Sequence, residues 1–309
     1  MPYFLAVDAG GTKTEFALAD EERELRRVRT GSIQRQRVDE ETAGRNLKDA
    51  LQQLESQTGI APGSIARCCI GTSGQTVPLI VAWLRKAFGE SVGGELILLG
   101  DVEIALDACF QGQRGILVMA GTGSNAAGRA STGQLLTAGG WGPVIADQGS
   151  GQFLSVAALR QGFLALDQDI EGRRTRLLDL ALQHWNLSSL NELIEFANSN
   201  PHPNFTTFAP LVAQAAIEKD IVASEIVEQG GQDLASLAGL LIERIRRLEP
   251  EQSEFEPPQV AITGSVLSGV APLREAFTRS LRNAYPQIRI AEAPADPIAG
   301  ALWRARKGA

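Results

Sequence analysis

The sequence predicts an α/β protein that repeats one structural plan in two domains, the second of which carries a helical insertion. Short apolar segments typical of strands alternate with amphipathic segments typical of helices. Two strands joined by a glycine turn open the chain, and the same pattern begins again near Gly115. The length of 309 residues also corresponds to about two domains.

The first half begins with strands over residues 3–7, 14–19 and 24–29, which predict an antiparallel meander with a glycine corner. A helix over 40–57 follows, because its leucines recur every three or four residues. The half then continues with a strand over 65–70, a helix over 77–88, a strand over 95–99 and a helix over 104–110. This alternation predicts parallel strands with both faces of the sheet covered.

The second half opens like the first, with a strand over 115–120, a turn over 121–124 and a strand over 125–130. A helical block then replaces the alternation, with helices over 152–166, 175–182, 190–197, 208–219 and 224–248. The half closes with a strand over 259–263, a helix over 271–284, a strand over 287–291 and a helix over 297–306.

Composition and charge exclude several classes of function. The net charge of -7 and the absence of a long basic run argue against nucleic-acid partners. No apolar run is long enough for a membrane span or a signal peptide, so we expect a cytoplasmic protein without membrane partners. Cys68, Cys69 and Cys109 lack metal-ligand spacing, and we expect buried thiols. His184 and His202 have no second ligand nearby, which argues against a zinc site or a histidine triad.

The first glycine corner is a candidate phosphate site and has the sequence Asp8-Ala9-Gly10-Gly11-Thr12-Lys13-Thr14. Glycines without Cβ atoms let backbone amides approach an anion together. Asp8 ends a strand and is placed to hold a hydrated Mg²⁺, while Thr12 and Lys13 add a hydroxyl and a positive charge. A plain hairpin also favours Gly-Gly, but it needs neither the acid before nor the Thr-Lys pair after.

Two further glycine elements follow apolar strands. Gly121-Thr122-Gly123-Ser124 occupies the equivalent place in the repeated plan, and two such corners can hold one triphosphate. Gly264-Ser265 precedes a helix and could seat an adenosine, although by itself an ordinary strand-to-helix turn explains it better.

Two aspartates are candidates for the acceptor side of a phosphoryl transfer. Asp101 follows the strand over 95–99, and the carboxyl ends of strands face the cleft of an α/β sheet, so it is the candidate base. Asp147 follows Trp141, a pair suited to gripping a sugar by its hydroxyls and its ring face. Each aspartate has an alternative interpretation as the N-cap of the next helix, which for Asp147 begins at Gln152.

These motifs resemble the acetate and sugar kinase, heat-shock and actin superfamily, and within it the N-acetylglucosamine kinase and BadF/BadG/BcrA/BcrD group. The matching segments span nearly the whole chain in family order: Asp8–Thr14, Gly100-Asp101, Ala120–Asn125, Gly139–Gly142, Asp147–Gly151, Thr263–Val266 and Asp296–Ala301.

The resemblance implies a fold of two ribonuclease-H-like, actin-like ATPase domains around a nucleotide cleft. The first domain would comprise residues 1–114 plus 296–309, and the second, residues 115–295, would carry the helical insertion. Family members commonly form homodimers, so the resemblance also implies a homodimer.

The resemblance further implies an ATP- and Mg²⁺-dependent kinase of a small amino sugar, with the 6-hydroxyl as acceptor and Asp101 as base. ATP phosphates would contact Gly10, Gly11, Thr12, Lys13, Thr14, Gly121, Thr122 and Gly123. Gly264 and Ser265 would lie by the adenosine. The sugar would contact Gln34, Asp101, Ser124, Asn125, Trp141, Gly142 and Asp147.

Two departures from the family pattern bear on the identity of the sugar. Gln34 stands where family kinases often carry Asn, and Gln148 replaces the usual Glu after Asp147. N-acetylglucosamine fits the family, whereas glucosamine or N-acetylmuramic acid would account for both changes.

Two functions of other classes are alternatives. An ATP-driven activator of a partner enzyme would resemble activases that share an iron–sulfur cluster between subunits, but Cys68, Cys69 and Cys109 lack that motif. A sugar-sensing regulator would resemble repressors with an N-terminal helix-turn-helix and a cysteine cluster. This chain begins directly with a strand and retains Asp8, Asp101 and Asp147.

Overall fold

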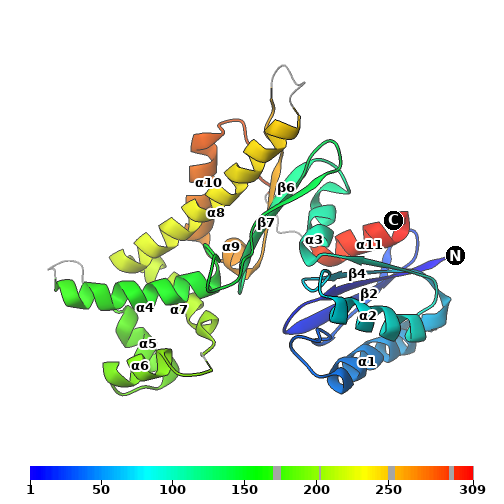
Figure 1. The fold of residues 1–309 in the computed structure, drawn as a ribbon, viewed down its shortest axis with the longest axis horizontal. Helices are drawn as coiled ribbons and strands as arrows, with labels where there is room; N and C mark the ends of the chain where they lie inside the picture. Colours follow the sequence, from blue (N-terminus) through cyan, green and yellow to red (C-terminus); the bar gives the residue numbers. More distant parts are fainter. Residues whose placement is uncertain (170–174, 202, 250–254, 292–295, 309) are drawn as a thin grey trace. The chain divides into compact units, whose positions relative to one another are not determined.

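The computed structural model describes residues 1–169, 175–201, 203–249, 255–291 and 296–308. The chain divides into two compact units (Figure 1). Unit 1 comprises Met1–Gly115 and Ala295–Ala309, and unit 2 comprises Ile116–Pro294.

Unit 1 is built on a five-stranded mixed sheet with the order β3-β2-β1-β4-β5. Its strands are β1 (Tyr3–Ala9), β2 (Lys13–Ala19), β3 (Glu24–Gly31), β4 (Ile65–Thr72) and β5 (Glu95–Leu99). The first three form the predicted antiparallel meander, whereas β4 pairs in parallel with both β1 and β5. The predicted parallel pairing is therefore confirmed.

Helices cover both faces of this sheet (Figure 1): α1 (Glu40–Thr58), α2 (Pro78–Ser91), α3 (Asp101–Phe110) and α11 (Pro297–Lys307). Strand residues alternate between two cores because successive side chains point to opposite faces. Leu5 and Val7 pack with α1 and α2, whereas Phe4 and Ala6 pack with α3 and α11. A short 3₁₀ turn, η1 (Pro62–Ser64), precedes β4.

Helix α1 begins and ends where its sequence provides caps. The Asp39 side chain accepts a hydrogen bond from the Thr42 amide at 2.7 Å, and Gly59 closes the helix in the left-handed region at φ 71°. Helix α3 instead begins at Asp101, three residues before the predicted start at Ile104.

Unit 2 repeats the plan with a four-stranded sheet of order β8-β7-β6-β9. Its strands are β6 (Gly115–Ala120), β7 (Ser124–Arg129), β8 (Leu135–Gly139) and β9 (Val260–Thr263). The first four strands of unit 1 have the same spatial order, which confirms the duplicated plan. Strand β8 was not predicted, and the strand expected over 287–291 is reduced to a single bridge between Val260 and Ile290.

The predicted helical block lies between β8 and β9, and its helices share one core with the sheet of unit 2. Its elements are α4 (Gly151–Gln168), α5 (Leu177–Trp185), α6 (Leu190–Ala197), η2 (Phe205–Phe208), α7 (Ala209–Ile217) and α8 (Ile221–Leu248). Helices α9 (Ser265–Gly269) and α10 (Ala271–Ala284) follow β9. None of the helices in the described residues is long and apolar enough to cross a membrane.

Candidate functional site

The glycine turn between β1 and β2 presents backbone amides at its tip. The Gly10 amide donates to the Asp8 carbonyl at 3.2 Å, which closes the turn. Among the described residues, no group accepts a hydrogen bond from the amides of Gly11 and Thr12. Two amides without an acceptor at one turn are suited to an anion.

The side chains after these amides are anchored to the sheet and to the following loop. Lys13 places its Nζ 3.6 Å from Glu15 Oε1, and Thr14 is fully buried. The Thr14 hydroxyl accepts a hydrogen bond from the Ile33 amide at 3.1 Å. Thr14 therefore holds the loop after β3 against the turn.

Asp8 and Asp101 are buried carboxyl groups near the ends of β1 and β5, and both have raised pKa values. Burial, then the negative charge of Asp101, raises the pKa of Asp8 from 3.8 to about 6. Burial also raises the pKa of Asp101, while hydrogen bonds from the Val102 and Asp101 amides oppose that shift. Buried carboxylates with raised pKa values are typical of functional sites.

Asp101 occupies the first position of α3, immediately after its N-cap Gly100. Its Oδ1 accepts a hydrogen bond from the Val102 amide at 2.8 Å. The partial positive charge at a helix N-terminus favours the charged carboxylate, which counteracts burial. The N-cap interpretation is thus wrong for Asp101 itself.

Gln34 lies beneath the first turn. Its Nε2 donates to the Ala9 carbonyl at 2.6 Å and to Ser73 Oγ at 3.0 Å. Its Oε1 lies 3.6 Å from the position of a Cβ built on Gly11, so the amide oxygen faces the turn. Sequence reasoning identified Gln34 but missed Ser73, which meets it only through the tertiary fold.

The second glycine corner, between β6 and β7, is held by helix α4. The Gly151 amide donates to the Gly121 carbonyl at 2.8 Å. Asp147 Oδ1 accepts from the Ser124 amide at 2.6 Å, and Asp147 Oδ2 accepts from Ser150 Oγ at 2.9 Å. Ser150, rather than Asp147, is the N-cap of α4. Among the described residues, no group accepts from the amides of Thr122 and Gly123.

The third glycine element lies beside the second corner. Gly264 has φ 96°, and a Cβ there would lie 2.4 Å from the Ala120 carbonyl oxygen, so only glycine fits. A Cβ on Gly121 would lie 3.6 Å from Ser265 Oγ. Unit 2 therefore places the second corner, predicted for phosphate, beside the two residues predicted for adenosine.

The loop after β8 carries the other predicted sugar residues. A Cβ on Gly140 would lie 2.9 Å from Asn125 Cγ, so this glycine packs directly on the amide of Asn125. Trp141 is 69% exposed, which leaves its ring free of a packing role in unit 2. Gly142 has φ 90° and pairs with Ala146 in a single bridge.

Two side-chain oxygens near these residues are buried without a hydrogen-bond partner among the described residues. They are Asn125 Oδ1 and Gln148 Oε1. Buried polar atoms are normally satisfied, so such atoms next to a candidate site indicate contact with a ligand. The sequence singled out Gln148 only as a departure from the family pattern.

Metal and thiol chemistry can be judged from the donor groups. No cluster of three or more His, Cys, Asp or Glu comes together in the described part of the chain. Asp8 and Asp101 do fit a hydrated Mg²⁺ brought in with a nucleotide, since a cation would relieve their repulsion. Cys68 and Cys69 are buried as expected, whereas Cys109 is only partly buried, and burial raises the pKa of Cys69 to about 12.

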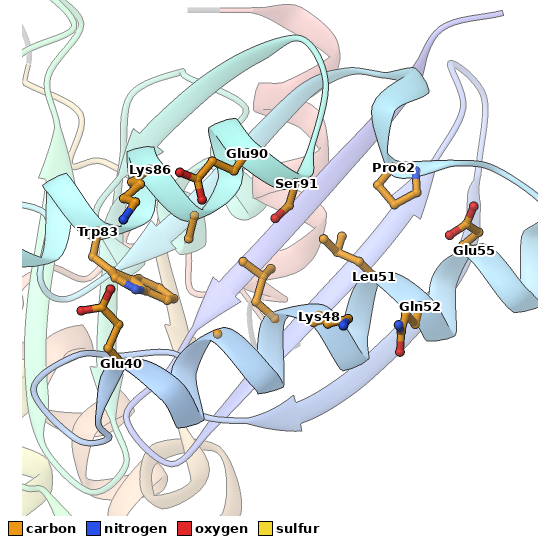
Figure 2. Close-up of a pocket in the computed structure, with 13 residues that line it drawn as sticks. Glu40, Lys48, Leu51, Gln52, Glu55, Pro62, Trp83, Lys86, Glu90 and Ser91 are labelled. Atoms are coloured by element: carbon orange, nitrogen blue, oxygen red, sulfur yellow. The ribbon is translucent and has the colours of Figure 1, made fainter.

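A groove between α1 and α2 lies apart from all these residues (Figure 2). Leu47, Leu51 and Trp83 form part of its lining, and charged side chains such as Lys48 and Glu90 lie along it. None of the candidate site residues lines this groove.

Comparison with known proteins gives a consistent match along the chain. The profile of the BadF/BadG/BcrA/BcrD ATPase family matches residues 5–303. The N-acetylmuramic acid/N-acetylglucosamine kinase of Clostridium acetobutylicum is 26% identical over 99% of both chains. The N-acetyl-D-glucosamine kinase of Dictyostelium discoideum is 27% identical over 96% of both chains.

A solved structure from Chromobacterium violaceum, described as a candidate N-acetylglucosamine kinase, covers 98% of both chains with a TM-score of 0.73 and 25% identity. This likeness and the repeated sheet order confirm the predicted α/β fold of two domains.

Proposed function

The chain belongs to the BadF/BadG/BcrA/BcrD ATPase family, and from that premise we propose that it is an ATP-dependent kinase of an amino sugar. Relatives that match nearly the whole chain are kinases of N-acetylglucosamine or of both N-acetylmuramic acid and N-acetylglucosamine. N-acetylglucosamine or a close relative is therefore the proposed acceptor, with glucosamine and N-acetylmuramic acid as alternatives, and its 6-hydroxyl the proposed point of attack.

The observation that carries the proposal is the pair of carboxylates beside a phosphate-type turn in unit 1. Burial raises the pKa of both Asp8 and Asp101, the charge of Asp101 adds to the shift of Asp8, and the Gly11 and Thr12 amides have no acceptor among the described residues. Phosphoryl transfer needs donors for phosphate oxygens and a carboxylate at the acceptor hydroxyl.

In the proposed reaction, Asp101 orients the sugar hydroxyl and takes its proton as that oxygen attacks the γ-phosphorus. The new bond joins the sugar oxygen to phosphorus, and the bond from the γ-phosphorus to the bridging oxygen breaks. The products are the sugar phosphate and ADP. The raised pKa of Asp101 makes it a stronger base than an exposed aspartate.

ATP would be held by amides and small side chains of the glycine elements. The proposed phosphate contacts are Gly10, Gly11, Thr12, Lys13, Thr14, Gly121, Thr122 and Gly123, and the adenosine contacts are Gly264 and Ser265. Asp8 would hold Mg²⁺ through water, and the ion would neutralise phosphate charge.

The proposed sugar contacts are Gln34, Asp101, Ser124, Asn125, Trp141, Gly142 and Asp147. The buried Asn125 Oδ1 without a partner supports this assignment, as does the exposed ring of Trp141. Asp147 also fixes the second corner through Ser124 and Ser150, so its role is partly to position that corner.

A coupled assay of ADP release tests the proposal. The purified protein with Mg²⁺ and ATP is given glucose, glucosamine, N-acetylglucosamine or N-acetylmuramic acid, and the product is located by NMR. We expect sugar-stimulated ADP release with at least one amino sugar and phosphate on its 6-oxygen. Folded protein that gives no stimulation with any amino sugar would refute the kinase assignment.

The alternative of an activator for a partner enzyme receives no support from the thiols. Cys68 and Cys69 are buried within β4, and burial raises the pKa of both. The homodimer and the cytoplasmic location stay predictions, and light scattering of the purified protein measures the former.

A further inference from the structure

The loop after β3 brings one arginine against the first glycine turn. The loop is bonded to the turn at several points: Ser32 Oγ donates to the Gly10 carbonyl at 2.9 Å, and Gln34 Nε2 donates to the Ala9 carbonyl at 2.6 Å. The Arg37 amide in turn donates to the Gln34 carbonyl at 2.9 Å. These bonds fix where the Arg37 side chain leaves the backbone.

Arg37 and Gln34 lie on the same side of Gly11. A Cβ built on Gly11 would lie 3.5 Å from Arg37 Nε, 3.8 Å from Arg37 Cγ and 3.6 Å from Gln34 Oε1. The missing side chain of Gly11 therefore leaves a surface bordered by a guanidinium and an amide oxygen. Arg37 is exposed, so a ligand can reach its guanidinium.

No carboxylate in the described part of the chain forms an ion pair with Arg37. The two other cations near the turn do lie close to carboxylates of the protein. Arg35 donates to the Val38 carbonyl at 2.7 Å and lies 3.8 Å from Glu40, and Lys13 lies 3.6 Å from Glu15. The Arg37 guanidinium is thus available to bind a ligand, whereas Arg35 and Lys13 already interact with glutamates of the protein.

A guanidinium matches a carboxylate or a phosphate with two parallel hydrogen bonds. The position favours the carboxylate of a sugar, because Arg37 shares its side of Gly11 with Gln34, a proposed sugar contact. Phosphate oxygens would instead meet the amides at the tip of the turn.

We propose that Arg37 is a specificity-determining residue that binds the carboxylate of an acidic amino sugar, so that N-acetylmuramic acid is the preferred acceptor. The proposal rests on the kinase function above and narrows its substrate class. N-acetylmuramic acid differs from N-acetylglucosamine by a lactyl ether, which supplies the carboxylate.

The test compares kcat/KM for N-acetylmuramic acid and N-acetylglucosamine in the wild type and in Arg37→Gln, Arg37→Lys and Arg26→Gln. Arg26 is a matched control, since it is an exposed arginine on β3 without an ion pair among the described residues. We expect Arg37→Gln to lower the ratio of the two values by about ten- to hundredfold. Arg37→Lys should retain part of the preference, and Arg26→Gln should keep the wild-type ratio.

Three results would overturn the inference while leaving the kinase assignment intact. The first is a wild type that phosphorylates N-acetylglucosamine but not N-acetylmuramic acid. The second is a ratio of the two kcat/KM values that Arg37→Gln does not change. The third is an equal loss of kcat/KM on both sugars together with a raised KM for ATP. The last would assign Arg37 to the phosphates. A wild type that phosphorylates no sugar would refute the kinase function and this inference together.

Discussion

Arg304 on α11 donates a hydrogen bond from Nε to Oδ2 of Asp107 on α3 at 3.0 Å, and Asp107 is completely buried. This ion pair joins α11 to the helix that begins with Asp101. The two helices also approach closely, because a Cβ on Gly300 would lie 1.8 Å from the Ile104 carbonyl oxygen.

Arg304→Met should destabilise the protein by about 3–5 kcal/mol, because it removes the Arg304 guanidinium from a buried carboxylate. Urea unfolding at pH 7 measures the change. Adding Asp107→Asn in the same chain should recover part of the loss, since the buried charge is then removed. An equally unstable double variant would show that charge is not the cause.

Asp101→Asn should lower kcat by about 10²–10⁴-fold with little change in the KM of the sugar, because the amide cannot accept the proton. The variant should fold normally, since the Asn oxygen can still accept from the Val102 amide. In the wild type, kcat/KM should rise with pH as Asp101 loses its proton, and this rise should be smaller in the variant, in which Asp8 still titrates. Near-normal turnover would remove Asp101 from the role of base.

Asp8→Asn should stabilise the protein without ligands at neutral pH. The folded state raises the pKa of Asp8 from 3.8 to about 6, so the folded protein binds a proton between these values that the unfolded chain has lost. Stability of the wild type therefore falls as pH rises from about 4 to 6, by about 2–3 kcal/mol. Asparagine does not ionise, so the Asp8→Asn variant does not lose this stability as pH rises. The stability difference should be near zero at pH 4 and largest at pH 7, as chemical unfolding at several pH values would show. A difference independent of pH would contradict the assigned cause.

Gly10→Ala and Gly11→Ala form a matched pair in one turn. A Cβ at Gly10 would lie 2.8 Å from the Lys13 carbonyl oxygen, so this change should cost about 1–3 kcal/mol of stability. A Cβ at Gly11 meets only side-chain atoms at 3.5 Å or more, so the fold should tolerate it within about 0.5 kcal/mol.

Gly11→Ala should nonetheless raise the KM for the acidic amino sugar by about tenfold, because the methyl group would occupy the surface beside Arg37 and Gln34. Thermal unfolding and steady-state kinetics of both variants separate the two effects. An unchanged KM for that sugar in folded Gly11→Ala would exclude its close approach to this side of Gly11.

The repeated sheet order was predictable because each unit opens with a glycine turn between two apolar strands. Strand β8 escaped prediction because Leu135–Gly139 is a five-residue segment that contains Thr137 and ends in glycine. The start of α3 at Asp101 escaped for another reason, since a single acidic residue after Gly100 can either precede or begin a helix.

Site residues were predictable where their chemistry is visible in the local sequence. They were not predictable where only the tertiary fold brings distant residues together. Asp8 and Asp101 stood out as acids at strand ends, and the structure places them close enough for the charge of Asp101 to raise the pKa of Asp8. Arg37 did not stand out among the many arginines of its region. Its position beside Gly11 depends on bonds from Ser32 and Gln34 that no sequence period specifies.

Helix α11 has a consequence for how the chain is made. Ile298, Ala301 and Leu302 complete one core of unit 1, yet the ribosome synthesises them after the whole of unit 2. Unit 2 is continuous in sequence and can fold as it emerges, whereas the sheet of unit 1 must wait with one face uncovered. Nascent chains that stop before residue 297 should therefore expose the apolar face of β1 and recruit chaperones until α11 arrives.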